Sequence, residues 1–145
     1  MADNDYTRIR ALVVDDDDSV RRVVRMLLSL LGLSAVAEAK DGVSGLLEVL
    51  RLHPDIIFCD IHMKPLGGIA FLRQLRTIKT ADLADTPVIM LTSETSPEAI
   101  AAVRELGANG YLIKPVSPPQ LKLRIDAVLG TAPALAERIR NRNRI

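Results

Sequence analysis

The strongest fold signal in this chain is the segment Ile56-Ile57-Phe58-Cys59-Asp60-Ile61-His62-Met63-Lys64-Pro65-Leu66-Gly67-Gly68. Its four leading apolar residues predict a short strand that is buried on both faces of a parallel sheet, and the proline and glycines that follow predict a turn. Asp60 would stand at the carboxyl end of that strand, where open α/β sheets bind their ligands. An aspartate at a strand end also caps turns, so Asp60 taken alone leaves a structural and a chemical interpretation open.

The composition indicates one domain with an aliphatic core. The chain has 145 residues and is 48% hydrophobic, which suits a single domain and leaves little room for two. Aromatic residues make up only 3% and there is no tryptophan, so leucine, valine, isoleucine and alanine must fill the interior. This balance favours helices packed on a parallel sheet over a β-sandwich.

The terminus and the cysteine content predict a cytoplasmic location. Residues 1–8 are polar, without the apolar core of a signal peptide, and no apolar run reaches the length of a membrane span. The single cysteine, Cys59, lies within the predicted buried strand and has no partner for an intramolecular disulfide. We therefore expect a cytoplasmic protein without a membrane partner.

Apolar periodicity predicts five strands alternating with five helices. The strands are expected at residues 9–14, 34–39, 56–60, 88–91 and 111–113, and the helices at 18–31, 41–52, 68–78, 97–106 and 117–130, with a polar loop at 80–87. Asp18 is expected to cap the first helix. The inward positions are predicted as Val20, Val23, Val24, Leu27, Leu28 and Leu31; Val43, Leu46, Leu47 and Leu50; Ile69, Leu72, Leu75 and Ile78; and Leu121, Ile125 and Val128.

Each unit of strand and helix spans about 20–25 residues, a length typical of right-handed parallel crossovers in a doubly wound sheet. The strand ends then meet at one edge and bring together Asp15–Asp18, Asp60, Thr92-Ser93 and Lys114. Acids gathered in a crevice repel one another unless a cation neutralises them, and Mg²⁺ is the expected ion. A carboxylate beside such an ion, with a hydroxyl and an ammonium group nearby, suits phosphoryl transfer to an aspartate.

Four motifs in this order resemble the receiver domain of two-component response regulators, in particular the single-domain, chemotaxis-like (CheY-like) type. The motifs are Val13-Val14-Asp15-Asp16, Cys59-Asp60 with Met63 and Gly68, Leu91-Thr92-Ser93, and Tyr111-Leu112-Ile113-Lys114-Pro115. The resemblance covers residues 9–130, leaving an N-terminal extension at 1–8 and a short basic tail at 131–145. It implies a flavodoxin-like, doubly wound, five-stranded parallel sheet of order 2-1-3-4-5 with five helices.

The resemblance also implies a role for each motif residue. Asp60 would accept a phosphoryl group from a histidine kinase or a histidine phosphotransfer protein, and the chain would catalyse only its own phosphorylation and dephosphorylation. Asp16 would bind Mg²⁺ directly, Asp15 through water, and His62 through its backbone carbonyl. Lys114 would pair with the phosphoryl group and precede a cis bond to Pro115.

A second set of implied roles concerns the switch and its lifetime. Thr92 would move toward the phosphoryl group while Tyr111 turns inward, and the surface of residues 97–106, 110–114 and 117–129 would bind a downstream protein. His62 and Glu94 would tune how fast water removes the phosphate. Leu123 lies off the buried stripe of the last helix and is a candidate contact for a partner, so we expect a monomer or a weak phosphorylation-dependent dimer.

Departures from the family pattern and two rival functions stay open. Lys64 replaces the usual proline after Met63, and Gly67 replaces a common acid, so the loop after Asp60 is expected to differ in shape. These two departures are the only support for one rival function, a phosphorylation-independent interaction module. The second rival is a phosphatase, because Asp15-x-Asp17-x-Ser19 also resembles the opening motif of haloacid-dehalogenase-type phosphatases. In those enzymes the assisting acids come after the lysine. Here the acid that follows Lys114 within the predicted domain, Asp126, falls inside a helical pattern.

The last residues are the most basic part of the chain. Residues 137–145 hold four arginines and one glutamate, whereas the whole chain has a net charge of only +1. Because Arg138, Arg140, Arg142 and Arg144 alternate with other residues, we expect a disordered extension whose removal leaves phosphorylation unchanged. The residues after Gly130 are too few for a helix-turn-helix domain, and no nucleic-acid partner is expected.

Overall fold

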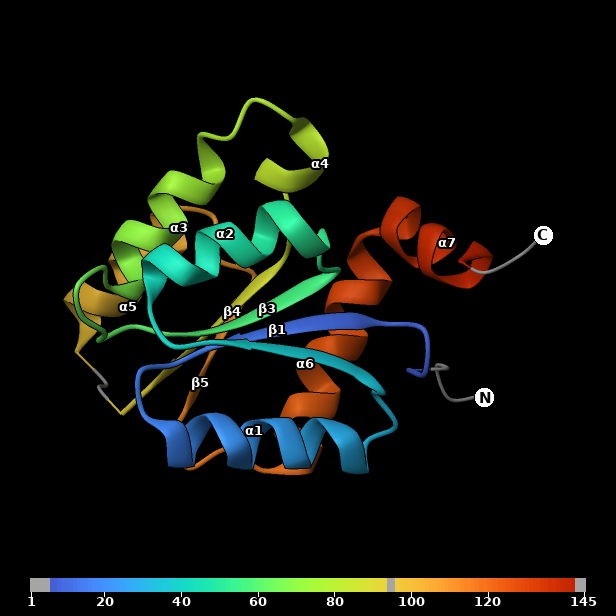
Figure 1. Ribbon diagram of the computed structural model, residues 1–145, viewed down its shortest axis with the longest axis horizontal. Coiled ribbons are helices and arrows are strands. Elements are labelled where there is room, and N and C mark those ends of the chain that lie inside the picture. Colours follow the sequence, from blue (N-terminus) through green and yellow to red (C-terminus); the bar gives the residue numbers. More distant parts are fainter. Residues whose placement is uncertain (1–5, 94–95, 143–145) are drawn as a thin grey trace.

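The structure is a computed structural model that describes residues 6–93 and 96–142. Its centre is a five-stranded parallel sheet in the order β2-β1-β3-β4-β5, which confirms the predicted topology (Figure 1). The strands are β1 (Arg10–Val14), β2 (Ala35–Ala39), β3 (Ile56–Asp60), β4 (Val88–Thr92) and β5 (Gly110–Ile113). Every residue of β3 and β4 is buried, as expected for central strands covered by helices on both faces.

Helices cover both faces of the sheet and create two apolar layers. One layer packs α1 (Asp18–Leu30) and α6 (Pro118–Thr131) around Val13, Phe58 and Leu91 (Figure 1). The helix α7 (Pro133–Asn141) extends this layer at the end of the sheet where the strands begin. The other packs α2 (Gly42–Leu52), α3 (Gly68–Arg76) and α5 (Pro97–Glu105) around Leu12, Ile57 and Met90. Alternate residues of each strand face opposite layers, so both faces of the sheet are apolar.

Two helices were not predicted. The segment expected as a polar loop contains the short helix α4 (Ala81–Ala84), which buries Leu83 and Ala84. The second is α7, in the segment expected to be a disordered tail. That expectation is wrong for residues 133–141, because Leu135 and Ile139 stand four residues apart on one helical face and are both buried. The alternating arginines obscured this spacing.

Ion pairs and hydrogen bonds tie α7 to the edge of the sheet at which the strands begin. The guanidinium of Arg142 binds the carboxylate of Asp55 with both terminal nitrogens, at 2.5 and 2.8 Å, and donates to the backbone carbonyl of Arg8 at 2.6 Å. Asp55 also accepts the backbone N–H of Arg10 at 2.8 Å. The C-terminal helix is thus packed and paired structure that covers the start of β3.

The predicted inward face of α2 is wrong for three of its four residues, whereas Leu46 packs against the core as expected. Val43, Leu47 and Leu50 are about half exposed, and the helix instead turns Gly45 and Val49 toward the sheet. A Cβ at Gly45 would lie 3.0 Å from the ring of Phe71, so this glycine permits close packing of α2 on α3. On α1 the predicted core residue Val23 is 47% exposed, and Asp17, not Asp18, caps the helix by accepting the N–H groups of Ser19 and Val20.

Among residues 6–93 and 96–142, none of the helices combines the length and the apolar character needed to cross a membrane. Cys59 is fully buried in β3, as predicted.

Candidate functional site

The predicted acids and the lysine meet at the edge of the sheet where the strands end. Asp15 directly follows β1, Asp60 is the last residue of β3, and Lys114 directly follows β5. Backbone hydrogen bonds fix these positions, since Asp15 donates its N–H to Ala39 at 3.1 Å and Lys114 donates its own to Thr92 at 2.8 Å. The hydrogen-bonded register of the parallel strands therefore places the backbones of Asp15, Asp60 and Lys114 side by side, independently of contacts between their side chains.

Lys114 bridges two buried carboxylates. Its ammonium nitrogen lies 2.9 Å from Asp15 Oδ2 and 3.1 Å from Asp60 Oδ1. Asp15 is fully buried and Asp60 is only 7% exposed. The other carboxylate oxygen of Asp15 accepts the backbone N–H of Asp17 at 2.9 Å, which holds that side chain in place.

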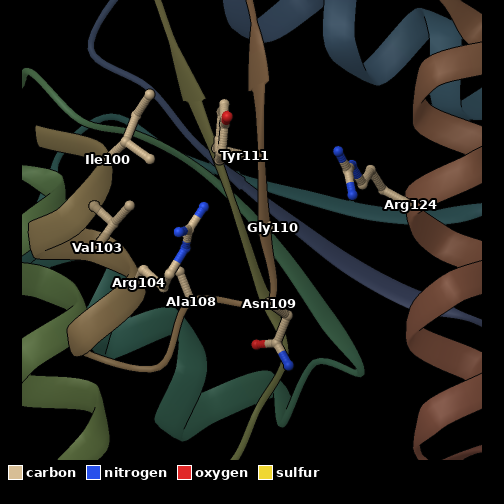
Figure 2. Close-up of a pocket in the computed structure, with 8 residues that line it drawn as sticks. All are labelled: Ile100, Val103, Arg104, Ala108, Asn109, Gly110, Tyr111 and Arg124. Atoms are coloured by element: carbon tan, nitrogen blue, oxygen red, sulfur yellow. The ribbon is translucent and has the colours of Figure 1, made fainter. Parts of the chain in front are cut away.

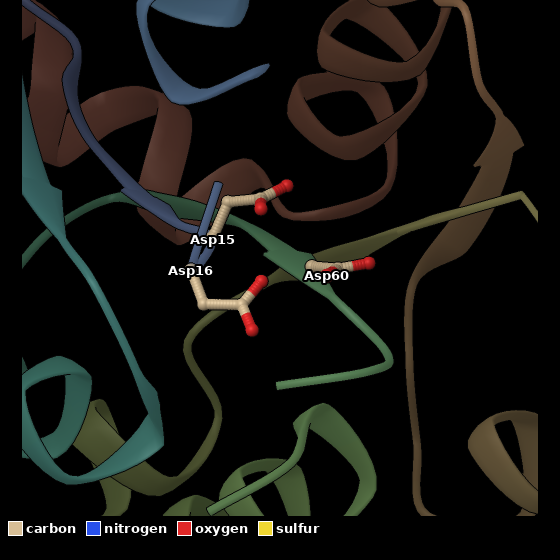
Figure 3. Close-up of side chains that lie close together, drawn as sticks. All are labelled: Asp15, Asp16 and Asp60. Atoms are coloured by element: carbon tan, nitrogen blue, oxygen red, sulfur yellow. The ribbon is translucent and has the colours of Figure 1, made fainter. Parts of the chain in front are cut away.

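A third carboxylate, Asp16, completes the cluster from the solvent side. Asp15, Asp16 and Asp60 each offer an oxygen, and these three atoms lie within 4.8 Å of one another (Figure 3). Asp16 is exposed while the other two are buried, so the group opens to water on one side. An open set of a few carboxylate oxygens fits Mg²⁺, which keeps several of its waters when it binds to proteins.

The electrostatics of the site reflect an excess of negative charge. Burial raises the pKa of Asp60, the neighbouring Asp15 carboxylate raises it further, and Lys114 opposes both. Burial alone would lower the pKa of Lys114, but its hydrogen bonds and ion pairs with Asp15 and Asp60 outweigh burial and raise it. Three acids facing one lysine are under-neutralised, and this imbalance favours a divalent cation.

The remaining predicted residues fall at or around this cluster. Thr92 ends β4 and is buried, and the peptide bond between Lys114 and Pro115 is cis, as expected. Tyr111 lies on β5, half-buried against the layer that includes Val103. His62 is exposed in the loop after β3. Glu94 lies outside the described residues.

Two features of the site were not predicted. Gly68 lies so close to the strand end that an added Cβ would be 2.1 Å from the backbone oxygen of Asp60, so only glycine fits there. Arg21 donates to the backbone carbonyl of Asp15 at 2.8 Å and pairs with Glu38 at 2.9 Å. Gly68 belongs to the family motif, but the motif does not indicate that the residue lies against the backbone of Asp60. For Arg21, no local sequence pattern indicates the contacts with Asp15 and Glu38.

Asp126 takes no part in the cluster. Its carboxylate accepts the hydroxyl of Tyr6 and the ammonium of Lys122, the latter at 2.8 Å, on α6. A haloacid-dehalogenase-type phosphatase needs an acid after the lysine to assist at the same site, and this candidate is engaged elsewhere. The geometry therefore gives that alternative no support.

Residues 11–126 match the model of the response regulator receiver domain. The chain belongs to this family. It is 33% identical over 120 residues to the chemotaxis protein CheY-3 of Vibrio cholerae, an alignment that covers 83% of this chain and 91% of that protein. It is 32% identical over 125 residues to the chemotaxis protein CheY1 of Helicobacter pylori, which covers 85% of this chain and 98% of CheY1.

Two further comparisons bear on the extent of this receiver domain. The probable transcriptional regulator ycf27 of Porphyridium aerugineum is 36% identical over 120 residues, but the chain spans only 48% of its length. A structure of CheY4 of Vibrio cholerae superposes with a TM-score of 0.76 at 34% identity, covering 83% of this chain and 98% of that one. The chain is thus mostly a CheY-like receiver domain of two-component signalling, with α7 lying after the matched residues.

Proposed function

We propose that Asp60 is the phosphoacceptor of this receiver domain. The observation that carries the proposal is Lys114 bridging the buried carboxylates of Asp15 and Asp60 at 2.9 and 3.1 Å. An Asp60 oxygen attacks the phosphorus of a donor phosphohistidine, the phosphorus–nitrogen bond breaks, and the imidazole leaves with its electron pair and takes up a proton. The donor class is a histidine kinase or a histidine phosphotransfer protein.

Mg²⁺ suits the acidic cluster. Asp16 would hold the ion directly, Asp15 through water, and Asp60 and the backbone carbonyl of His62 would complete the protein ligands. When bound, the ion supplies positive charge against the phosphoryl oxygens. Asp15 also keeps Lys114 in position through their 2.9 Å contact, so this acid has a positioning role as well.

Lys114 and Thr92 would stabilise the phosphorylated state. The ammonium group of Lys114 already reaches Asp60 and would form a charge-assisted hydrogen bond with a phosphoryl oxygen. Thr92 ends the strand next to β3 and would donate its hydroxyl to the same group. Its movement, followed by Tyr111, would alter the surface made by α5, β5 and α6, where Leu123 is 66% exposed.

The domain acts in this proposal as a switch and not as an enzyme on other substrates. Water attacks the phosphoaspartate and returns Asp60 and inorganic phosphate, at a rate that His62 and Glu94 would tune. A cytoplasmic location, a downstream protein target and a monomer or weak dimer fit this role. The chief alternative, a phosphorylation-independent interaction module, has only Lys64 and Gly67 in its favour.

Intact mass analysis tests the phosphoacceptor directly. The protein is incubated with acetyl phosphate and Mg²⁺, and we expect the mass of one phosphoryl group to be added. Asp60→Asn and an EDTA sample should both remain unmodified, whereas Asp85→Asn, which changes an exposed acid, should react like the wild type. Equal modification of Asp60→Asn would refute the assignment.

The switch is tested with beryllofluoride, a mimic of the phosphoryl group. Amide resonances should shift around Asp60 and across α5, β5 and α6 in the wild type. Thr92→Ala should keep the shifts near Asp60 and lose most of those near Tyr111. Distant shifts that persist unchanged in this variant would contradict the proposed coupling.

A further inference from the structure

A cavity of about 210 Å³ lies at the edge of the sheet where the strands begin, and thus at the opposite edge from Asp60. The start of β1, the connection between α2 and β3, the helix α4 and the end of α7 all contribute to its lining. Three of the lining residues are arginines, namely Arg10, Arg138 and Arg142. The cavity is separate from the one of about 360 Å³ beside Tyr111, which lies on the surface that the proposed function uses (Figure 2).

The cavity depends on α7, which follows the part of the chain that matches the receiver domain. That match covers residues 11–126, so all three arginines lie outside it. The helix docks through the buried side chains of Leu135 and Ile139, and this docking brings its two arginines close to the first residue of β1. The cluster of arginines is therefore a feature that the segments flanking the matched domain add to it.

Two of the three arginines have no acid to balance their charge. Arg142 is paired with both carboxylate oxygens of Asp55. In the part of the chain that the structure describes, neither Arg10 nor Arg138 has its side chain in an ion pair with a carboxylate. Arg138 and Arg142 also stand four residues apart, a spacing at which like charges destabilise a helix. The cavity therefore has a surplus of positive charge that an anion would balance.

The size and the charge of the cavity restrict the anion. Its volume is below the roughly 300–1,000 Å³ of pockets that hold drug-sized molecules, so the occupant must be small. Guanidinium groups match the oxygens of a phosphate through parallel N–H bonds. A phosphate monoester carries a charge of about −1.5 to −2 at neutral pH, and it would balance both Arg10 and Arg138. A single carboxylate would balance only one of them.

The other lining residues favour an ester that carries hydroxyl groups. An ionised Asp82 only accepts hydrogen bonds, so it would repel a phosphate placed against it but accept a hydroxyl. The side chains of Pro54 and Leu83 offer apolar contact to a short carbon chain, and the ring of His53 adds an N–H donor. A phosphorylated polyol offers a group to each of these residues, whereas inorganic phosphate has no carbon chain.

We propose that this cavity binds a small phosphorylated polyol, with the phosphate held by Arg10 and Arg138 and a hydroxyl donated to Asp82. The bound molecule would connect α7 to the start of β1, in addition to the ion pair between Arg142 and Asp55. Neither Asp60 nor Mg²⁺ takes part in this binding. The site therefore stands apart from the proposed phosphoacceptor, and each can fail without the other.

The test follows the amide and Nε–Hε resonances of the full chain in EDTA while glycerol 3-phosphate is added. The signals of Arg10 and Arg138 should shift saturably, and acetate, glycerol and inorganic phosphate should each bind at least five-fold more weakly. Arg10→Gln and Arg138→Gln should each weaken the binding of glycerol 3-phosphate at least five-fold. Arg140→Gln is the matched control, because it removes the same charge from an exposed position of α7 outside the cavity lining, and it should leave binding unchanged.

The methyl resonances of Leu135 and Ile139 report whether α7 stays docked in each variant. With α7 docked, unchanged binding to Arg138→Gln, or an equal loss in Arg140→Gln, would overturn the inference. If Arg138→Gln undocks the helix, Arg10→Gln on β1 decides alone. Inorganic phosphate that binds as tightly as glycerol 3-phosphate would overturn the assignment to an ester. Shifts confined to the surroundings of Lys114 would overturn the site itself, because the anion would then bind at the acidic edge.

Discussion

The two ends of β3 each carry a buried aspartate, Asp55 at the start and Asp60 at the end, but the charges around them differ. Asp55 is paired through both carboxylate oxygens with Arg142 and also accepts the backbone N–H of Arg10. Asp60 shares one lysine with Asp15, and Asp16 stands beside them. One end is neutralised within the chain, and the other is left with excess negative charge.

This difference separates the two ends by role. A neutralised, hydrogen-bonded pair holds α7 and the strand start together and gains nothing from an external ion. In an under-neutralised cluster the carboxylates repel one another, and binding of a cation or a positively charged partner relieves this repulsion. We therefore expect mutations at the Asp55 end to lower stability, and mutations at the Asp60 end to change binding and chemistry without lowering stability.

The largest effect should come from removing the apolar contacts of α7. Leu135→Ala and Ile139→Ala each empty a buried site between α7 and the sheet, so each should lower the free energy of unfolding by about 2–5 kcal/mol. Urea unfolding followed by circular dichroism measures this loss. Glu137→Gln, on the exposed side of the same helix, is the control and should change little. Wild-type stability in both alanine variants would mean that α7 is not docked in solution.

Neutralising the two aspartates should have opposite effects. Asp55→Asn removes the charge that Arg142 pairs with and should destabilise the protein by about 2 kcal/mol. Asp60→Asn removes a buried charge and its repulsion from Asp15 and should stabilise the Mg²⁺-free protein. Denaturation in EDTA at pH 7 compares them, and destabilisation by both would break the contrast.

The sign of the second effect follows from the raised pKa of Asp60. A carboxyl whose pKa is higher in the folded state favours folding when protonated, and that contribution is lost as pH rises through the folded pKa. The advantage of Asp60→Asn should therefore be present at neutral pH and vanish in acid, below the ordinary pKa of an aspartate. An advantage that is independent of pH would have another cause.

Mg²⁺ binding should also distinguish the two ends of β3. The ion should raise the thermal midpoint of the wild type, and Asp16→Asn should weaken its apparent affinity at least several-fold, because one of three carboxylates is lost. Differential scanning fluorimetry across a Mg²⁺ titration measures both effects. Asp55→Asn should bind the ion with wild-type affinity. Equal affinity of Asp16→Asn would place the ion elsewhere.

The smallest effect concerns the N-terminal segment near the neutralised end. Burial and the hydrogen bond to Asp126 raise the pKa of Tyr6 to about 12. The contribution of this hydroxyl to folding is present below pH 10, the ordinary pKa of tyrosine, and is lost as pH rises from 10 to 12. The stability difference between wild type and Tyr6→Phe should shrink over that interval. A constant difference would show that the hydroxyl does not titrate with folding.

The sheet and its acidic edge could be predicted from sequence because both follow from local signals. Apolar runs that end in Asp15, Asp60 and Lys114 set the strands, and parallel crossovers bring their ends together. The family motifs then supplied the strand order. Contacts between segments distant in the chain, such as Arg142 with Asp55, leave no periodic trace in either segment and were missed.

The errors on helix faces have a related cause. The pattern of large apolar residues on α2 predicted Val43, Leu47 and Leu50 as buried, whereas the sheet accepts Gly45 and Val49 because the space there is narrow. Periodicity identifies an apolar stripe but does not measure the room available to it. In α7 the opposite occurred, since charged residues masked a valid stripe of Leu135 and Ile139.

The anchoring of Asp55 has a consequence for how a signal would travel from Asp60. The start of β3 is tied sideways to β1 through Arg10 and to α7 through Arg142, so the strand cannot slide along its own axis without breaking these bonds. A phosphoryl group on Asp60 would therefore not shift β3 along its own axis. Under the proposed function, the displacement would pass laterally, from β3 to Thr92 on β4 and onward to β5, whose residue Ile113 pairs with Thr92.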